Sequence, residues 1–209
     1  MTMSMNRVIH GAVRRDLDRF VDALARFPDG DRSRAEDLHR AWAFFDGELT
    51  RHHEGEHEIA WPALQQVGVS AETLAAMDAE HEVMADALRA ARASLATLRA
   101  EPTSGSAERS RAAVAELRQV TVTHLEHEER EVEPAYQAHL EHPAIKEMGR
   151  RFARAQKPPQ AGRFFAWVTD GAGPEEQAAA SHGIPRPVMA VLGLLGRGYR
   201  RDVAPVWQR

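Results

Sequence analysis

The chain has 209 residues, with a hydrophobic fraction of 43%, a charged fraction of 28% and a net charge of −4. These values are typical of a soluble globular protein, and the lack of a long basic block argues against nucleic acid as a partner. The sequence contains no cysteine. Disulfides, zinc–thiolate sites and iron–sulfur clusters are therefore excluded, so any metal must be held by histidine and carboxylate side chains.

Two segments bear on localisation. Met1–Arg7 lacks the apolar run of a signal peptide, and the longest apolar stretch, Val188–Leu195, is too short to span a bilayer. We therefore expect a cytoplasmic protein without a membrane partner.

Residues 1–140 have the pattern of four amphipathic helices, with apolar side chains at spacings of three and four. The expected helices cover Met5–Phe27, Ser33–Ala63, Ser70–Arg99 and the residues from about Ala107 onward. Because the connections between them are short, we expect an all-α, up-down-up-down four-helix bundle.

Residues 141–209, the C-terminal extension, differ in composition. This part holds several prolines and glycines and short apolar pieces such as Phe164–Val168 and Pro187–Leu195. We expect short helices that pack on the bundle, and no strand pattern is convincing. The domain organisation is therefore a bundle at 1–140 and a helical extension at 141–209.

Two segments of the bundle repeat each other. His52–Pro62 and His124–Pro134 both read His-x-x-x-Glu, with a proline ten residues after the histidine. Residues four apart on a helix differ by about 40° in direction and about 6 Å in rise, so each segment presents an imidazole and a carboxylate on one face. Two such pairs in one core predict a metal site, most simply a dinuclear one.

Each expected helix brings one histidine to its apolar face, and a glutamate follows two of them by one turn. The resulting candidate ligands are His10, His52, Glu56, His81, His124 and Glu128. Since a buried carboxylate costs several kcal/mol unless it is compensated, two inward glutamates favour a pair of cations over a purely structural core or a solvated charged face. The histidines at positions 39, 53, 57, 127, 139, 142 and 182 lie off these faces, although His53, His57 and His127 are close enough to remain candidates.

Two other metal sites must be weighed. His53-Glu54-Gly55-Glu56-His57 matches His-Glu-x-x-His, the pattern of zinc peptidases, in which two histidines bind zinc and the glutamate activates water. This alternative is less favoured because it gives the histidines of the other three helices no role. A ferritin-like site needs Glu-x-x-His on two helices, and the fourth helix has none.

The full set of motifs resembles the hemerythrin-like, or HHE cation-binding, family. The matching elements are His10, His52-x-x-x-Glu56, His81 after Glu80, His124-x-x-x-Glu128, and the segments His57–Pro62 and Glu129–Pro134, within about residues 5–140. The resemblance implies an antiparallel bundle with a non-haem di-iron centre. It implies that His10 and His52 bind one iron, that His81 and His124 bind the other, and that Glu56 and Glu128 bridge them beside an oxo or hydroxo group.

The sequence departs from the oxygen-carrying members of that family. Those members use five histidines, including His-x-x-x-His on the third helix, whereas here Met77 precedes His81 by four residues and Ala85 follows it by four. We expect a carboxylate such as Glu80 or Glu82, or water, at the missing position. Those members also carry His-x-x-x-x-Asp on the fourth helix. In this chain Glu129 stands five residues after His124, at the position of that Asp. Glu128 and Glu129 are therefore both candidates for the bridge, and the repeat favours Glu128.

The resemblance implies two functional classes. Six protein ligands leave open positions on two octahedral irons, so the protein would bind or react with O₂, peroxide or nitric oxide, in sensing or detoxification rather than simple O₂ transport. The alternative is a peroxide-decomposing, catalase-like enzyme. His53, His57 and Tyr136 are candidate bases, no residue is assigned a catalytic role, and the sequence does not indicate an oligomeric state.

Overall fold

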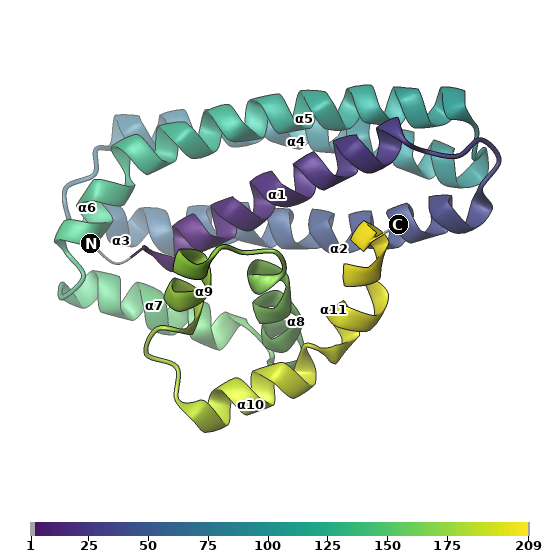
Figure 1. Ribbon diagram of the computed structural model, residues 1–209. Helices are drawn as coiled ribbons and strands as arrows, with labels where there is room; N and C mark the ends of the chain where they lie inside the picture. The colour runs from purple at the N-terminus through teal and green to yellow at the C-terminus, as the bar shows by residue number, and fades with distance from the viewer. Residues whose placement is uncertain (1–2, 209) are drawn as a thin grey trace.

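A computed structural model describes residues 3–208, and all regular structure in that range is helical, as the sequence predicts. Four long helices lie alongside one another (Figure 1). They are α1 (Met5–Ala25), α2 (Arg32–Gly55), α4 (Ala71–Ala100) and α5 (Ser104–Glu131). Helix α5 packs against α1 and α4, and α2 packs against α1 and α4, so each long helix contacts two of the others.

Each long helix begins at a capping side chain. Ser4, Asp31, Ser70 and Thr103 each accept a hydrogen bond from the backbone N–H three residues further on. Such caps satisfy one of the free N–H groups at a helix start. The predicted starts of the first three helices are therefore close to the observed ones, whereas the fourth helix begins at Ser104, three residues before the predicted start at Ala107.

The second expected helix is not one continuous α-helix. It ends at Gly55, continues as a π-helical turn at Glu56–Ala60, and resumes as α3 (Trp61–Gln65). Pro62 has no N–H to donate to the carbonyl of Glu58, and that carbonyl accepts a hydrogen bond from Arg151 instead. The proline of the first repeat thus accounts for the interruption.

The second repeat also ends in a break. Helix α5 ends at Glu131, and α6 (Glu133–Ala138) begins after one intervening residue, with Pro134 in its first turn. Proline is tolerated there because its missing N–H would have no partner within the helix.

The C-terminal extension folds over the long helices on the side of α1 and α2 (Figure 1). Its elements are α7 (Pro143–Ala155), α8 (Pro158–Thr169), α9 (Pro174–Ser181), α10 (Arg186–Leu195), α11 (Arg197–Asp202) and a 3₁₀ turn at Ala204–Gln208. Helices α8 and α9 contact α1, the 3₁₀ turn contacts α2, and α7 contacts α3 and the π turn. Trp167, Tyr199 and Val206 are buried in the same hydrophobic core as Phe20 of α1.

A buried polar network joins the extension to α1. The Trp167 indole N–H donates to Asp16 at 2.8 Å, and Arg19 donates to both Asp16 and Asp170 at 3.0 Å. Tyr199 donates its hydroxyl proton to Asp170 at 3.0 Å. Because Asp16 is only 1% exposed, these donors compensate the burial of its carboxylate.

None of the helices in residues 3–208 is both long and apolar enough to cross a membrane.

Candidate metal centre

The six predicted ligands lie together between the four long helices. With His53 as a seventh residue, the donor atoms form two groups, each within 4.8 Å: one of His10, His52, Glu56 and Glu128, and one of His53, Glu56, His81 and His124. Glu56 belongs to both groups. The helical patterns explain this convergence, since His10 continues the buried positions Val13 and Leu17 on α1, and His124 and Glu128 continue Leu117 and Thr121 on α5.

The two carboxylates occupy the centre of the cluster. Glu56 has one oxygen 3.1 Å from His52 Nε2 and its other oxygen 3.4 Å from His81 Nε2. Glu128 Oε2 lies 3.1 Å from His10 Nε2 and 4.0 Å from His124 Nε2. Each glutamate therefore faces histidines of both groups, as a bridging ligand must.

Several buried atoms at the centre lack a hydrogen bond. They are Nε2 of His10, His52 and His53, both carboxylate oxygens of Glu56, and Oε2 of Glu128. In folded proteins nearly all buried polar atoms are hydrogen-bonded, whereas these six atoms face one another in imidazole–carboxylate contacts, so the cluster requires a physical explanation. Neutral imidazole nitrogens and carboxylate oxygens that converge within a few ångströms are suited to divalent metal ions, and these residues therefore fit such a group.

Burial shifts the proton affinities in the cluster. It lowers the pKa of His52 and of His53 well below the usual range, which leaves both imidazoles neutral and able to donate a lone pair. Burial, with the nearby Glu128 carboxylate, raises the pKa of Glu56 well above the usual range. Burial would also lower the pKa of His10, but the adjacent carboxylates of Glu128 and Glu129 outweigh it and raise that pKa to about 9. In the absence of a cation, protons held by His10 and Glu56 offset the negative charge of the buried carboxylates.

Carboxylates outside the cluster fix the orientation of two imidazoles. Nδ1 of His10 lies 2.8 Å from Glu129, and Nδ1 of His124 lies 2.8 Å from Glu80. An ionised carboxylate can only accept, so Nδ1 carries a proton in both rings and Nε2 is the nitrogen that faces the cluster. In His10 a bound cation would replace the second proton, which the raised pKa places on Nε2. Such carboxylate–histidine pairs are usual behind metal ligands, where they set the tautomer and raise the basicity of the ring.

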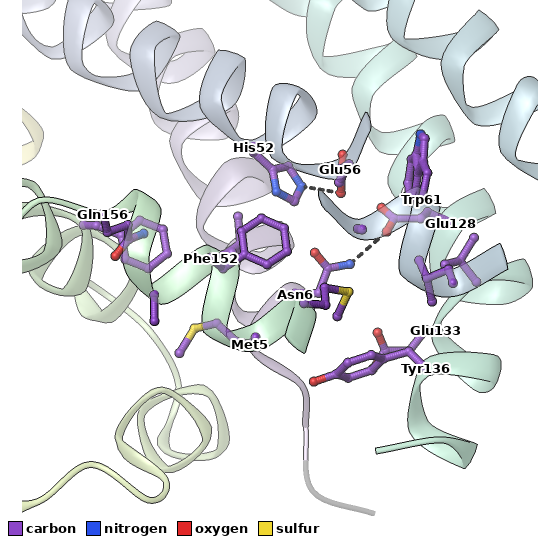
Figure 2. A pocket seen from close by; sticks show the side chains of 18 residues that line it. Met5, Asn6, His52, Glu56, Trp61, Glu128, Glu133, Tyr136, Phe152 and Gln156 are labelled. Atoms are coloured by element: carbon purple, nitrogen blue, oxygen red, sulfur yellow. Dashed lines mark hydrogen bonds and ion pairs between the residues drawn. The ribbon is translucent and has the colours of Figure 1, made fainter. Parts of the chain in front are cut away.

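The structure favours Glu128 over Glu129 at the centre. Glu129 pairs with His10 and with Arg14 at 2.7 Å, and these partners outweigh burial and lower its pKa to about 2. Glu128 instead points into the cluster, where Asn6 donates one hydrogen bond to its other oxygen at 2.9 Å (Figure 2). The choice made from the repeat agrees with this geometry.

His53, whose position in the sequence lies off the inner face of its expected helix, joins the cluster in the structure. Its ring stacks on that of His81 with centroids 4.3 Å apart, and it belongs to the second group of donors. His53 on α2 is therefore a further candidate ligand beside His81, whose own helix has Met77 and Ala85 at the positions four residues away. The doublet His52-His53 was the available signal, since adjacent helical residues point about 100° apart and can face two different metals.

The substitutes suggested for a fifth histidine do not take that position. Glu80 accepts hydrogen bonds from His124 and from His127, at 2.8 and 2.7 Å, and Glu82 is exposed.

The His-Glu-x-x-His pattern does not form a common site. His53 faces the cluster, whereas the His57 side chain is 67% exposed and pairs with Asp78 at 3.2 Å. Glu54 is also exposed. Asp78 accepts a hydrogen bond from the Trp61 indole at 2.8 Å, and that indole stacks on His81. His57 thus contacts Asp78, which also binds Trp61 beside the cluster, and it is in neither group of donors.

The fold and the buried cluster define an all-helical protein with a candidate binding site for cations. Residues 6–136 match the model of the hemerythrin HHE cation-binding domain. The chain therefore belongs to that family, as the motifs had indicated, and the match covers the four long helices and all candidate ligands. No curated protein and no solved structure matches the chain.

Proposed function

We propose that the four long helices form the up-down-up-down bundle typical of this family and that the cluster binds two iron ions. One ion is held by His10 and His52, the other by His53, His81 and His124, with Glu56 and Glu128 bridging. The observation that carries the proposal is the set of unpartnered buried donor atoms, divided into two groups that share Glu56. Imidazole and carboxylate ligands together suit iron.

We propose further that the site binds or reacts with O₂, peroxide or nitric oxide. Iron supplies open coordination positions and redox chemistry when it is bound. The protein's contribution is to hold neutral imidazoles in one tautomer and to keep water away from the centre, where His10 and His124 are no more than 1% exposed. Five histidines at the site keep reversible O₂ binding among these functions.

Elemental analysis and optical spectroscopy test this function. The purified protein should contain two irons per chain, and its absorption spectrum should change on addition of peroxide, O₂ or nitric oxide. His52→Ala and Glu128→Ala should lose the metal, while His39→Ala, which changes a histidine outside both groups, should keep it. A single zinc and no iron would contradict the proposal.

A peroxide-decomposing enzyme is the second candidate, favoured by a proton path. From the buried His124 a hydrogen-bonded chain passes through Glu80 to His127, whose side chain is 27% exposed. Decomposition of two peroxides to O₂ and two waters moves two protons from one peroxide to the other, and such a relay could carry them. Oxygen evolution that falls in Glu80→Gln without loss of iron supports this candidate; a stable adduct without turnover supports the binding function.

A further inference from the structure

A cavity of about 420 Å³ adjoins the first group of donors. His52, Glu56 and Glu128 border it at one end, where the two carboxylates and the His52 imidazole face one another (Figure 2). These three residues are the only candidate metal ligands in its lining, and the second group meets a different, polar opening beside His57 and Asp78. The two halves of the cluster therefore have different surroundings.

The remaining wall of this cavity is largely apolar and comes from two parts of the chain. The part of the chain before α7 contributes Met5, Ile9, Ala60, Trp61, Leu64, Val132 and Tyr136, whereas α7 and α8 contribute Met148, Phe152 and Phe164. Phe152 packs against Gly55 so closely that a Cβ at Gly55 would lie 2.7 Å from its ring. Because α7 and α8 lie outside the residues matched by the family model, the extension builds a wall that the family domain does not supply.

The size of the cavity exceeds what O₂, peroxide or nitric oxide require. One water molecule takes about 30 Å³ in the liquid, and a diatomic ligand is of similar size. Cavities of roughly 300–1,000 Å³ with apolar walls and a few convergent polar groups are those that bind organic molecules. No Lys or Arg lines the cavity, whereas Glu56, Glu128 and Glu133 do, so the lining offers no cationic Lys or Arg side chain to an anionic group.

We propose that this cavity binds an uncharged organic molecule with an apolar body and one polar group, and that the polar group lies at the His52, Glu56 and Glu128 end. The apolar body contacts α3 on one side and α7 on the other. The proposal goes beyond the metal and its small ligands, and it can be tested on protein with or without iron.

Prodan, an uncharged naphthalene ketone whose emission shifts to the blue in apolar surroundings, is a suitable probe. The full-length protein should bind it saturably at one site per chain. Gly149 lines the cavity and a Cβ there meets no atom within 4 Å, so Gly149→Phe can add a ring at the cavity wall. We expect this variant to bind prodan about tenfold more weakly or worse, because the ring takes the ligand's space.

Two matched controls separate the cavity from the other exposed apolar surface of the extension. Gly193 on α10 is also a helical glycine with open space around it, and Gly193→Phe should bind prodan like the unaltered protein. Met148→Asp, which places a charge in the cavity wall, should weaken binding, whereas Val191→Asp, on the exposed side of α10, should not.

Circular dichroism and iron content check that each variant folds and keeps the metal site. If Gly149→Phe does not fold, Met148→Asp decides the question. The proposal is overturned if the unaltered protein shows no saturable prodan binding, if a folded Gly149→Phe binds as tightly as the unaltered protein, or if Val191→Asp abolishes binding. A variant that loses prodan binding but keeps its iron affects the cavity alone, and a variant that loses iron but keeps prodan binding affects the metal centre alone. The two proposals can therefore fail independently of each other.

Discussion

At the scale of single residues, the site depends on two adjacent histidines that face different parts of one cluster. His52 contacts Glu56 at 3.1 Å, while His53 stacks on His81. Their directions differ by about 100° around the helix, which is too far for one metal but suits two metals a few ångströms apart. Burial keeps both imidazoles neutral by lowering their pKa, and this removes the competition between proton and metal.

His53→Ala should therefore remove one metal and leave the other. We expect iron to fall from two per chain to about one, because His10, His52 and the two glutamates remain as ligands. Elemental analysis of folded protein measures this. The control is His57→Ala, a nearby histidine outside both groups, which should keep both irons. Equal loss in the two variants would contradict the assignment of His53.

At the scale of elements, prolines shape the two helices that carry the repeated motif. Pro62 and Pro134 cannot donate a backbone hydrogen bond, and a π turn precedes one while a helix break precedes the other. π turns are rare and are often found at functional sites. Here the turn begins at Glu56, the residue common to both groups of donors, and it leads to Trp61, which supports His81 and lines the cavity.

The contact between α1 and α8 gives a prediction for stability. Trp167→Phe removes the indole donor to the buried Asp16 and should destabilise the fold by about 1–3 kcal/mol beyond the loss of packing. Trp207→Phe is the matched control, because the Trp207 indole nitrogen is buried without a hydrogen bond. Urea denaturation of both variants measures the difference. Equal free energies of unfolding would show that the Asp16 hydrogen bond contributes little.

At the scale of the whole molecule, the extension and the long helices share one hydrophobic core. Phe20 and Trp42 of the long helices pack edge-to-face, and Trp207 of the extension packs in the same way against Phe20. The buried carboxylates of the cluster oppose folding unless protons or cations compensate them. Metal binding should therefore stabilise the entire fold and not only the site.

Removal of the metal should lower the melting temperature. A ligand at a hundred times its dissociation constant stabilises the folded state by about 2.7 kcal/mol, so chelation should produce a clear shift in a thermal scan. Glu128→Ala, which loses a central ligand, provides the control, and its melting temperature should not respond to the chelator. A chelator-independent melting temperature in the unaltered, iron-loaded protein would contradict a link between metal and fold.

The helical periodicity of the sequence predicts where the long helices lie and which histidines face inward. Spacings of three and four placed the four long helices and brought His10, His52, His81 and His124 to their inner faces, because each pattern is local to one helix. The repeat also identified Glu56 and Glu128, since both follow their histidine by one turn.

Only the tertiary structure decided which neighbours of those residues share the site. His53 enters the cluster, and Glu80 lies behind His124, because the rotation of each helix about its axis is set by packing against the others and is not encoded in any single pattern. The same holds for the cavity, whose walls come from segments far apart in the sequence. Local patterns therefore determined the helices and the first six candidate ligands, whereas the place of His53 in the cluster and the cavity arose from contacts between helices.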